Sequence, residues 1–227
     1  MFDIEKFFEL NDISFKNIFL NSKSIFEVSK NIEFFLKNID FKIKSKIPKN
    51  AYLENISSIY IEEDVTIEPF SYIKGPAYIQ KGAVIRHSAY LRGNVILGKN
   101  AVVGHSTEVK NSIFFNNAKA PHFSYVGDSI IGNNVNIGAG VKIANYKLDA
   151  KNIFVKINEK KIDTNLNKLG AIIGDFTQIG CNSILNPGTM LERGCKIYPL
   201  SNVFGYFFQN SIVKPENMGI LKNASIK

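Results

Sequence analysis

Branched aliphatic residues return at every sixth position through most of this chain. The pattern is interrupted twice, so it runs in three stretches. The positions are Ile61, Ile67, Ile73, Ile79, Ile85, Leu91, Leu97, Val103 and Val109, then Ile131, Ile137 and Ile143, and finally Ile173, Ile179, Leu185, Leu191, Ile197 and Val203. A six-residue period is typical of a β-helix, in which three short parallel strands make one triangular coil. Residues 51–203 should therefore form roughly six coils, an all-β architecture.

The residue four places after each aliphatic is usually small or β-branched, as at Ala77, Ala89 and Thr107. We expect both positions to point inward, where the coil narrows. Cys195 occupies such a small inward position and is expected to serve packing. Cys181 falls at a corner or on a face, where a reactive thiol would need exposure.

The two ends of the chain follow other patterns. Residues 1–50 carry apolar side chains at spacings near three and four, which predicts a short α-helical N-terminal segment of two or three helices. Residues 204–227 form a C-terminal tail whose packing the sequence leaves open. Between the second and third stretches, NIFVKI and KKID are joined by Asn158 and Glu159 and predict a hairpin arm.

Composition narrows the class of protein. The 227 residues contain no long apolar run and the N-terminus is acidic, so neither a membrane span nor a signal peptide is expected. Two cysteines make no disulfide framework, which favours a reduced, cytoplasmic setting. The net charge of +8 fits either an anionic partner or a compositional bias toward lysine. No dense Lys/Arg run or nucleic-acid-binding motif is present, so a nucleic-acid partner is not expected.

The repeat also predicts which side chains stack on successive coils. Lys74, Arg92 and Lys110 each follow an inward aliphatic and should form a basic ladder along one edge. Like charges this close repel unless an anion or an acid lies between them. The ladder is therefore either a phosphate-binding edge or a row of solvated charges. His87 and His105 should stack in the same way, with or without a function.

A set of motifs follows in a fixed order through the first interruption of the repeat and the coils on either side of it. These are AYLRG (89–93), EVKNS (108–112), KAPHFSYVGD (119–128), NVNIGAG (134–140) and Asn145-Tyr146. Together they resemble the acetyltransferase domain of the bifunctional N-acetylglucosamine-1-phosphate uridyltransferase/glucosamine-1-phosphate acetyltransferase family. The resemblance covers residues 85–203 and implies a left-handed coil. The nucleotidyltransferase domain of that family has no counterpart in the first 50 residues, so uridyl transfer is not expected.

The resemblance implies roles for individual residues. His122 matches the catalytic histidine, and Glu108 is placed to orient or acidify the site. The positions matching sugar-phosphate contacts are Arg92, Lys110, Tyr125 and Asn136. The positions matching the acetyl-CoA site are Ala139, Asn145 and Tyr146, together with Cys181, where the family has a serine. No metal is expected. A proline precedes His122 where the family has a glycine, and the segment after Tyr146 is longer.

The chemistry of the residues agrees with acyl transfer. A histidine of ordinary pKa, about 6.5, can take a proton from an amine at neutral pH, and fixed cations suit a sugar phosphate. The resemblance implies acetyl-CoA as donor, an amino-sugar phosphate or nucleotide amino sugar as acceptor, and a homotrimer with sites between subunits. Two alternatives stay open. One is a zinc enzyme of the γ-carbonic-anhydrase type using His87, His105 and His122, and the other is a non-catalytic β-helix subunit.

Overall fold

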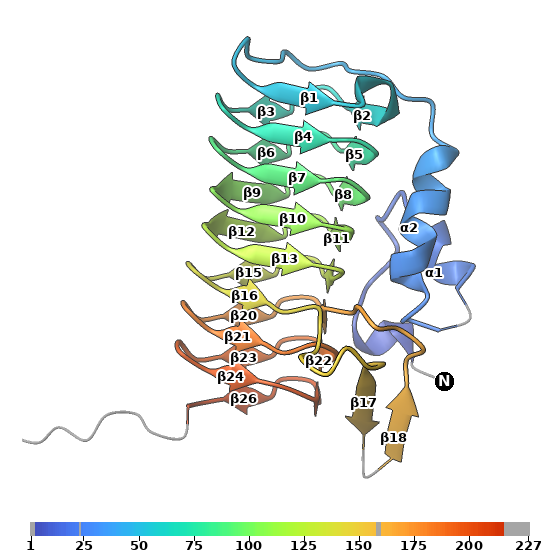
Figure 1. Ribbon diagram of the computed structural model, residues 1–227, viewed down its shortest axis with the longest axis vertical. Helices are drawn as coiled ribbons and strands as arrows, with labels where there is room; N and C mark the ends of the chain where they lie inside the picture. Colours follow the sequence, from blue (N-terminus) through green and yellow to red (C-terminus); the bar gives the residue numbers. More distant parts are fainter. Residues whose placement is uncertain (1–2, 23, 158–159, 216–227) are drawn as a thin grey trace, which may run out of the picture.

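The computed structural model describes residues 3–22, 24–157 and 160–215, and it shows a triangular parallel β-helix with helices against one side (Figure 1). Its three faces are eight-stranded parallel sheets. The front sheet contains β1 (Tyr52–Glu54), β4 (Tyr72–Lys74), β7 (Tyr90–Arg92), β10 (Glu108–Lys110), β13 (Tyr125–Gly127), β16 (Lys142–Ile143), β21 (Ile184–Leu185) and β24 (Asn202–Val203).

The other two faces are built in the same way. The helix-side sheet contains β2 (Ile59–Ile61), β5 (Ala77–Ile79), β8 (Val95–Leu97), β11 (Ser112–Phe114), β14 (Ile130–Ile131), β19 (Ala171–Ile173), β22 (Thr189–Leu191) and β25 (Tyr206–Phe207). The rear sheet contains β3 (Thr66–Ile67), β6 (Val84–Ile85), β9 (Val102–His105), β12 (Lys119–His122), β15 (Asn136–Ile137), β20 (Gln178–Ile179), β23 (Lys196–Ile197) and β26 (Ile212–Val213).

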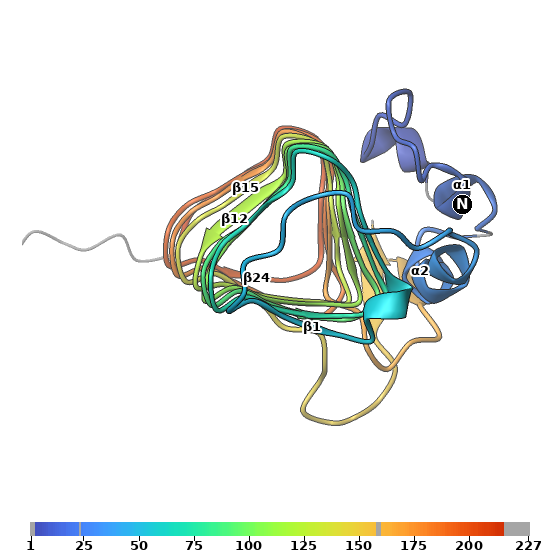
Figure 2. The same ribbon diagram turned by 90° about the horizontal axis from the view of Figure 1, so that it is seen from above.

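The coil is left-handed. In Figure 1 the front strands run to the right and the rear strands to the left while the chain descends. Seen from above in Figure 2, the chain therefore turns anticlockwise as it moves away from the viewer. The predicted parallel β-helix of hexapeptide repeats is confirmed, and its interior is the expected stack of fully buried aliphatics, such as Ile73, Leu91 and Val109.

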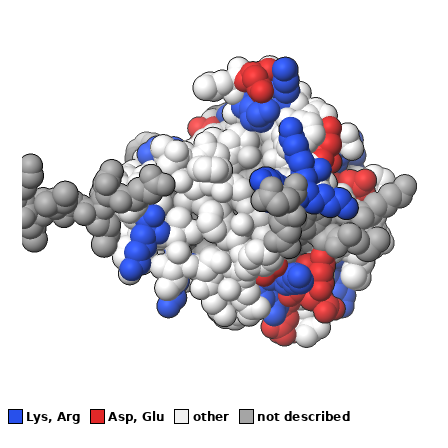
Figure 3. All heavy atoms as spheres, turned by 90° about the horizontal axis from the view of Figure 1, so that it is seen from below, with Lys and Arg blue, Asp and Glu red and all other residues white. Residues whose placement is uncertain are grey.

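The estimate of six coils was too low, because each sheet has eight strands. The first coil starts at Tyr52, before the six-residue repeat of aliphatics begins at Ile61. The coils continue past Val203 into the segment that was expected to be a tail. There Phe207 pairs with Leu191 and Val213 with Ile197. Residues 216–227 lie outside the described part of the chain. Seen from below, the centre of the last coils shows few charged side chains (Figure 3).

The interruption of the repeat shortens two successive coils by one residue each without breaking the stack, since Val109 pairs with Val126 and Val126 with Ile143, each 17 residues on. Leu97 pairs with Ile79 on one side and with Phe114 on the other, one residue earlier than the period predicts. His122 consequently lies opposite His105 in the rear sheet. The shortened register thus aligns all three histidines of the chain on successive coils.

The N-terminal segment packs on the helix-side sheet. It contains the 3-10 turn η1 (Ile4–Lys6) and the helices α1 (Asn17–Leu20) and α2 (Val28–Lys37), and a second turn, η2 (Ile56–Ser58), follows β1. Phe115, one residue past β11, is the anchor: its ring centroid lies 4.9 Å from that of Phe8 and 5.2 Å from that of Phe19. Burial of these rings supplies a second apolar core outside the coil.

The longer segment after Tyr146 leaves the coil and returns at Leu169. It includes the antiparallel strands β17 (Phe154–Ile157) and β18 (Lys160–Asp163), and the turn between them lies outside the described residues. At the base of this arm, Ile153 and Val155 are buried in the same apolar core as the N-terminal segment. Among the described residues, no helix is long and apolar enough to cross a membrane.

Candidate functional site

The predicted basic ladder on the front sheet is neutralised by acids of the same chain. Lys74 Nζ lies 2.8 Å from Glu54 Oε1, and Arg92 Nη1 lies 2.6 Å from Glu108 Oε1. Lys74 and Arg92 are register partners on β4 and β7, as the period predicts. Acidic side chains therefore lie beside the stacked cations and offset their mutual repulsion, one of the two arrangements that the sequence left open. The ladder is a row of ion pairs, in which each cation is held in place at the surface.

Lys110 makes the least exposed of these pairs, with Asp128. The Lys110 Nζ–Asp128 Oδ2 distance is 3.4 Å, and the Asp128 side chain is only 7% exposed. Asn111 Nδ2 donates to Asp128 Oδ1 at 2.7 Å, and Asn145 Nδ2 donates to Asp128 Oδ2. Asp128 is thus a buried acceptor that fixes one cation and two amides. Sequence reasoning passed over it, although it closes the KAPHFSYVGD motif.

Tyr125 lies at the centre of the same face. It pairs with Glu108 on β10 and with Lys142 on β16, and its hydroxyl donates to Asn145 Oδ1 at 3.4 Å. Burial, and then the nearby charges of Glu108 and Asp128, raise the pKa of Tyr125, so the phenol stays protonated. A Cβ at Gly127 would stand 2.7 Å from this hydroxyl, so glycine here makes room for it.

The three histidines form a column at the corner where the rear sheet turns into the front sheet. The rings of His87 and His105 stack with centroids 5.3 Å apart, and those of His105 and His122 meet edge to face at 5.2 Å. The predicted stack of His87 on His105 is confirmed, and His122 extends it. Gly104 lies against the backbone of Pro121, the residue before His122, so closely that a Cβ at Gly104 would overlap the Pro121 carbonyl.

The same corner brings together two of the four predicted acetyl-CoA residues. Asn182 N donates to Ala139 O at 2.8 Å, which places Ala139 and Cys181 on adjacent coils. Cys181 is exposed, whereas Cys195 is buried, and burial raises the pKa of the Cys195 thiol to about 11. Phe123 lies at this edge with a positive φ of 32° and is 48% exposed.

The other two, Asn145 and Tyr146, lie at the opposite edge of the front sheet. Tyr146 lines a groove of about 790 Å³ between the coil and the base of the arm. Lys147, Lys161, Asp149 and Phe204 also line it, and Lys147 Nζ lies 3.0 Å from Asp149 Oδ1. The groove thus offers two cations, one of them paired with an acid, and apolar surface. Asn136 is separate again, since it is exposed on the rear sheet between Lys119 and Gln178.

One chain therefore presents the predicted site in separate parts. His122 and Asp128 are six residues apart on a chain that turns a corner at Phe123, and a strand rises about 3.3 Å per residue, so the histidine corner and the Asp128 cluster lie at opposite edges of the front sheet, at most roughly 20 Å apart. Arg92, Glu108 and Tyr125 lie on the face between these edges. Within the described ranges, no group of three or more His, Cys, Asp or Glu side chains has the arrangement of a metal site.

The sequence is similar to those of bifunctional proteins. A family model described as the GMPPB C-terminal domain matches residues 73–159. A bifunctional sugar-1-phosphate nucleotidylyltransferase/acetyltransferase of Sulfurisphaera tokodaii is 42% identical over 156 residues, which are 66% of this chain and 39% of that protein. Bifunctional protein GlmU of Methanococcus aeolicus is 43% identical over 149 residues, which are 66% of this chain and 36% of that protein.

Among solved structures, a UDP-N-acetylglucosamine acyltransferase of Francisella novicida aligns over 76% of this chain and 62% of that one, with 14% identity and a TM-score of 0.37. The part of the chain that matches the two bifunctional relatives covers only 39% and 36% of their lengths, well under half of each. The resemblance to bifunctional nucleotidylyltransferase/acetyltransferases that the motifs indicated is confirmed at the level of sequence.

Proposed function

We propose that this chain is a CoA-dependent acyltransferase that moves an acetyl group to the amine of an amino-sugar phosphate. The observation that carries the proposal is the front-sheet arrangement of Arg92, Glu108, Tyr125 and Lys110, with Lys110 fixed by Asp128. These are oriented cations and hydrogen-bonding groups on one rigid face. The relatives whose names include an acetyltransferase support the same reaction.

The proposed step is a direct transfer. The acceptor nitrogen attacks the thioester carbonyl carbon, and His122 takes the proton that the nitrogen loses. The tetrahedral intermediate then collapses, the carbon–sulfur bond breaks, and the departing thiolate receives a proton from His122. Arg92 and Lys110 bind the phosphate of the acceptor, Tyr125 orients the sugar, and Asn136, which lies on the rear sheet, would orient the sugar bound at a neighbouring copy. Glu108 sets the position of the Arg92 guanidinium.

The donor would occupy the groove that Tyr146 lines. Its lysines suit the phosphates of CoA, and its apolar wall suits the pantetheine arm. Ala139 and Cys181 lie at the other edge of the face, so we assign them to the donor bound by a neighbouring copy. The same assay tests the alternatives. These are donors with acyl chains longer than acetyl, and acceptors that carry a different amino sugar or a nucleotide amino sugar.

A homotrimer completes this proposal. The histidine corner and the Asp128 cluster are too far apart on one chain to act on one substrate, and a second copy would bring one edge to the other. The histidine corner also carries exposed apolar side chains, Phe70 at 69%, Phe123 at 48% and Leu200 at 71%. Such an edge suits burial against another copy.

The direct experiment incubates the protein with acetyl-CoA and glucosamine-1-phosphate and follows both CoA and acetylated product by mass spectrometry. Equal amounts of the two products are expected. Glucose-1-phosphate, which lacks the amine, is the matched control and should give none. Failure to acetylate any amino-sugar phosphate or nucleotide amino sugar would contradict the proposal.

A further inference from the structure

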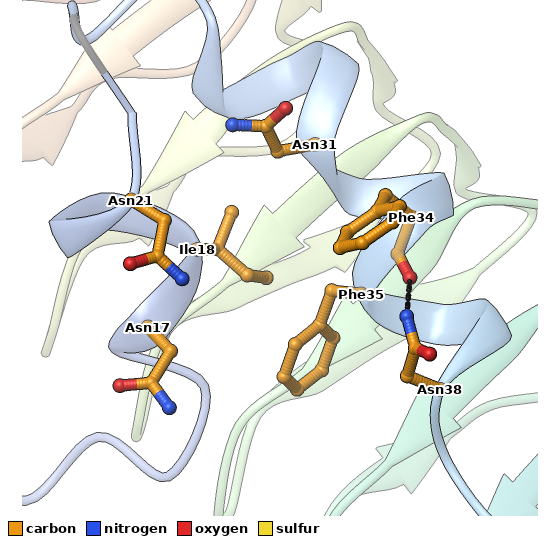
Figure 4. A pocket seen from close by; sticks show the side chains of 7 residues that line it. All are labelled: Asn17, Ile18, Asn21, Asn31, Phe34, Phe35 and Asn38. Atoms are coloured by element: carbon orange, nitrogen blue, oxygen red, sulfur yellow. Dashed lines mark hydrogen bonds between the residues drawn. The ribbon is translucent and has the colours of Figure 1, made fainter.

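A second cavity lies between α1 and α2, in the N-terminal segment. Its volume is about 460 Å³, which is within the range of small-molecule sites (Figure 4). Its lining belongs entirely to residues 17–38, so it shares no residue with the candidate acyltransferase site. The described lining consists of four asparagines, two phenylalanines and one isoleucine. None of these described residues is charged, whereas charged side chains line the front face and the groove beside the arm.

The two walls of the cavity are apolar. Ile18 faces it from α1, and the rings of Phe34 and Phe35 face it from α2 (Figure 4). Phe34 is 73% exposed although it borders the cavity. A flat ligand lying against this ring would remove apolar surface from water, and aromatic stacking would add to the gain.

The four amides stand at the rim, and two of them are held by hydrogen bonds. Asn38 Nδ2 donates to Phe34 O at 2.7 Å, and Asn31 Nδ2 donates to Ser22 Oγ at 2.8 Å. In Figure 4 the amide nitrogens of Asn17 and Asn21 turn toward the cavity. The rim therefore offers the amide donors of Asn17 and Asn21 on the α1 side. On the α2 side it offers the amides of Asn31 and Asn38, which their hydrogen bonds hold in place.

We propose that this cavity binds the base of an uncharged nucleoside, stacked on the exposed ring of Phe34 beside Phe35, with the buried Ile18 side chain behind the site. Proteins hold an unpaired base by stacking it between aromatic or apolar side chains and by hydrogen bonds to its edge, and asparagine amides match base edges well. The described lining consists of amides and apolar side chains, which match the base and its ribose, so these are the recognised part. This site adds a binding function and does not depend on the proposed acyl transfer.

The test titrates the whole chain with uridine and with adenosine by calorimetry, and with N-acetylglucosamine as a neutral sugar for comparison. We expect saturable binding of at least one nucleoside and none of the sugar. Phe34→Ala should weaken nucleoside binding by about tenfold, the size of one lost stacking contact. Leu20→Ala is the matched control, because Leu20 is an apolar side chain of α1, 64% exposed and outside the cavity.

A second variant keeps the shape of the rim. Asn21→Asp replaces an amide donor by a carboxylate acceptor, and it should weaken nucleoside binding while circular dichroism stays unchanged. Absence of saturable nucleoside binding would overturn the proposal. So would binding of the sugar alone, or equal affinities of the Phe34→Ala and Leu20→Ala variants for the nucleoside.

Discussion

Asp128 Oδ2 lies 3.4 Å from Lys110 Nζ, and the two residues come from adjacent coils of the front face. The carboxylate is buried beneath the lysine and also accepts hydrogen bonds from Asn111 and Asn145. The Asp128 carboxylate holds all three partners in place, because breaking any of these contacts would leave a buried charged group without a hydrogen bond, which costs free energy. Asp128 therefore determines how Lys110, the proposed phosphate-binding cation, and Asn145, a proposed donor-site residue, stand relative to each other.

Asp128→Asn keeps the shape of this side chain and removes its charge. We expect kcat/KM for acetyl transfer to fall by about tenfold or more, the size of one charge-assisted hydrogen bond, mainly through a higher KM. Steady-state kinetics measure the effect. Asp64→Asn, at an exposed acid paired with Lys81, should leave the kinetics unchanged. An unaltered KM in Asp128→Asn would exclude the positioning role.

His122→Ala removes the proposed base from the end of the histidine column. We expect kcat to drop by about 100-fold or more, as is usual for loss of a general base, while the protein stays folded. His87→Ala provides the comparison, since His87 belongs to the same column but lies two coils away and pairs with Glu68. Similar losses in both variants would show that the column matters for structure and that His122 is not the base.

Gly104→Ala should destabilise the coil. A Cβ there would stand 1.7 Å from Pro121 O, a backbone atom that cannot move without shifting His122. Overpacking of this kind usually costs about 1–3 kcal/mol of unfolding free energy. Chemical denaturation should show this loss, and Ser106→Ala, at an exposed position two residues later, should not. A Gly104→Ala variant of unchanged stability would mean that the coil yields easily at this point.

The sequence predicted the coil because most inward positions obey one steric rule that repeats every six residues. It missed the last coil because aromatic residues such as Phe207 stand where aliphatics stood before. It also missed the shortened register, since a deletion of one residue becomes visible only through its pairing, as between Leu97 and Phe114. Asp128 was overlooked because its burial arises from contacts between coils, which no local pattern records.

The sequence also did not predict that the site residues lie on different parts of the coil. Motif order places Ala139 close to Asn145 along the chain, yet the coil carries them to opposite edges of the front face. A solenoid converts short sequence distances into different faces, because each strand is followed at once by a corner. The stacking partners, by contrast, were predictable, as the ring contact of His87 with His105 demonstrates.

The two thiols should differ sharply toward alkylation. At pH 8 a thiol of pKa about 11 is ionised to only about one part in a thousand, and the Cys195 thiol is also buried. Iodoacetamide should therefore label exposed Cys181 and spare Cys195 until the protein unfolds. Peptide mass spectrometry with and without denaturant tests this. Labelling of both cysteines in the folded protein would contradict the burial of Cys195.

The proposed trimer makes Phe123 a side chain of the interface. Phe123→Glu places a charge on the apolar edge beside His122, so its burial against a second copy would become unfavourable. We expect the variant to sediment as a monomer and to lose acetyl transfer, because the two edges of the site then no longer meet. Phe176→Glu is the control, at a similarly exposed phenylalanine with positive φ on a different corner. A wild-type protein that sediments as a monomer yet transfers acetyl groups would show that one chain forms the whole site.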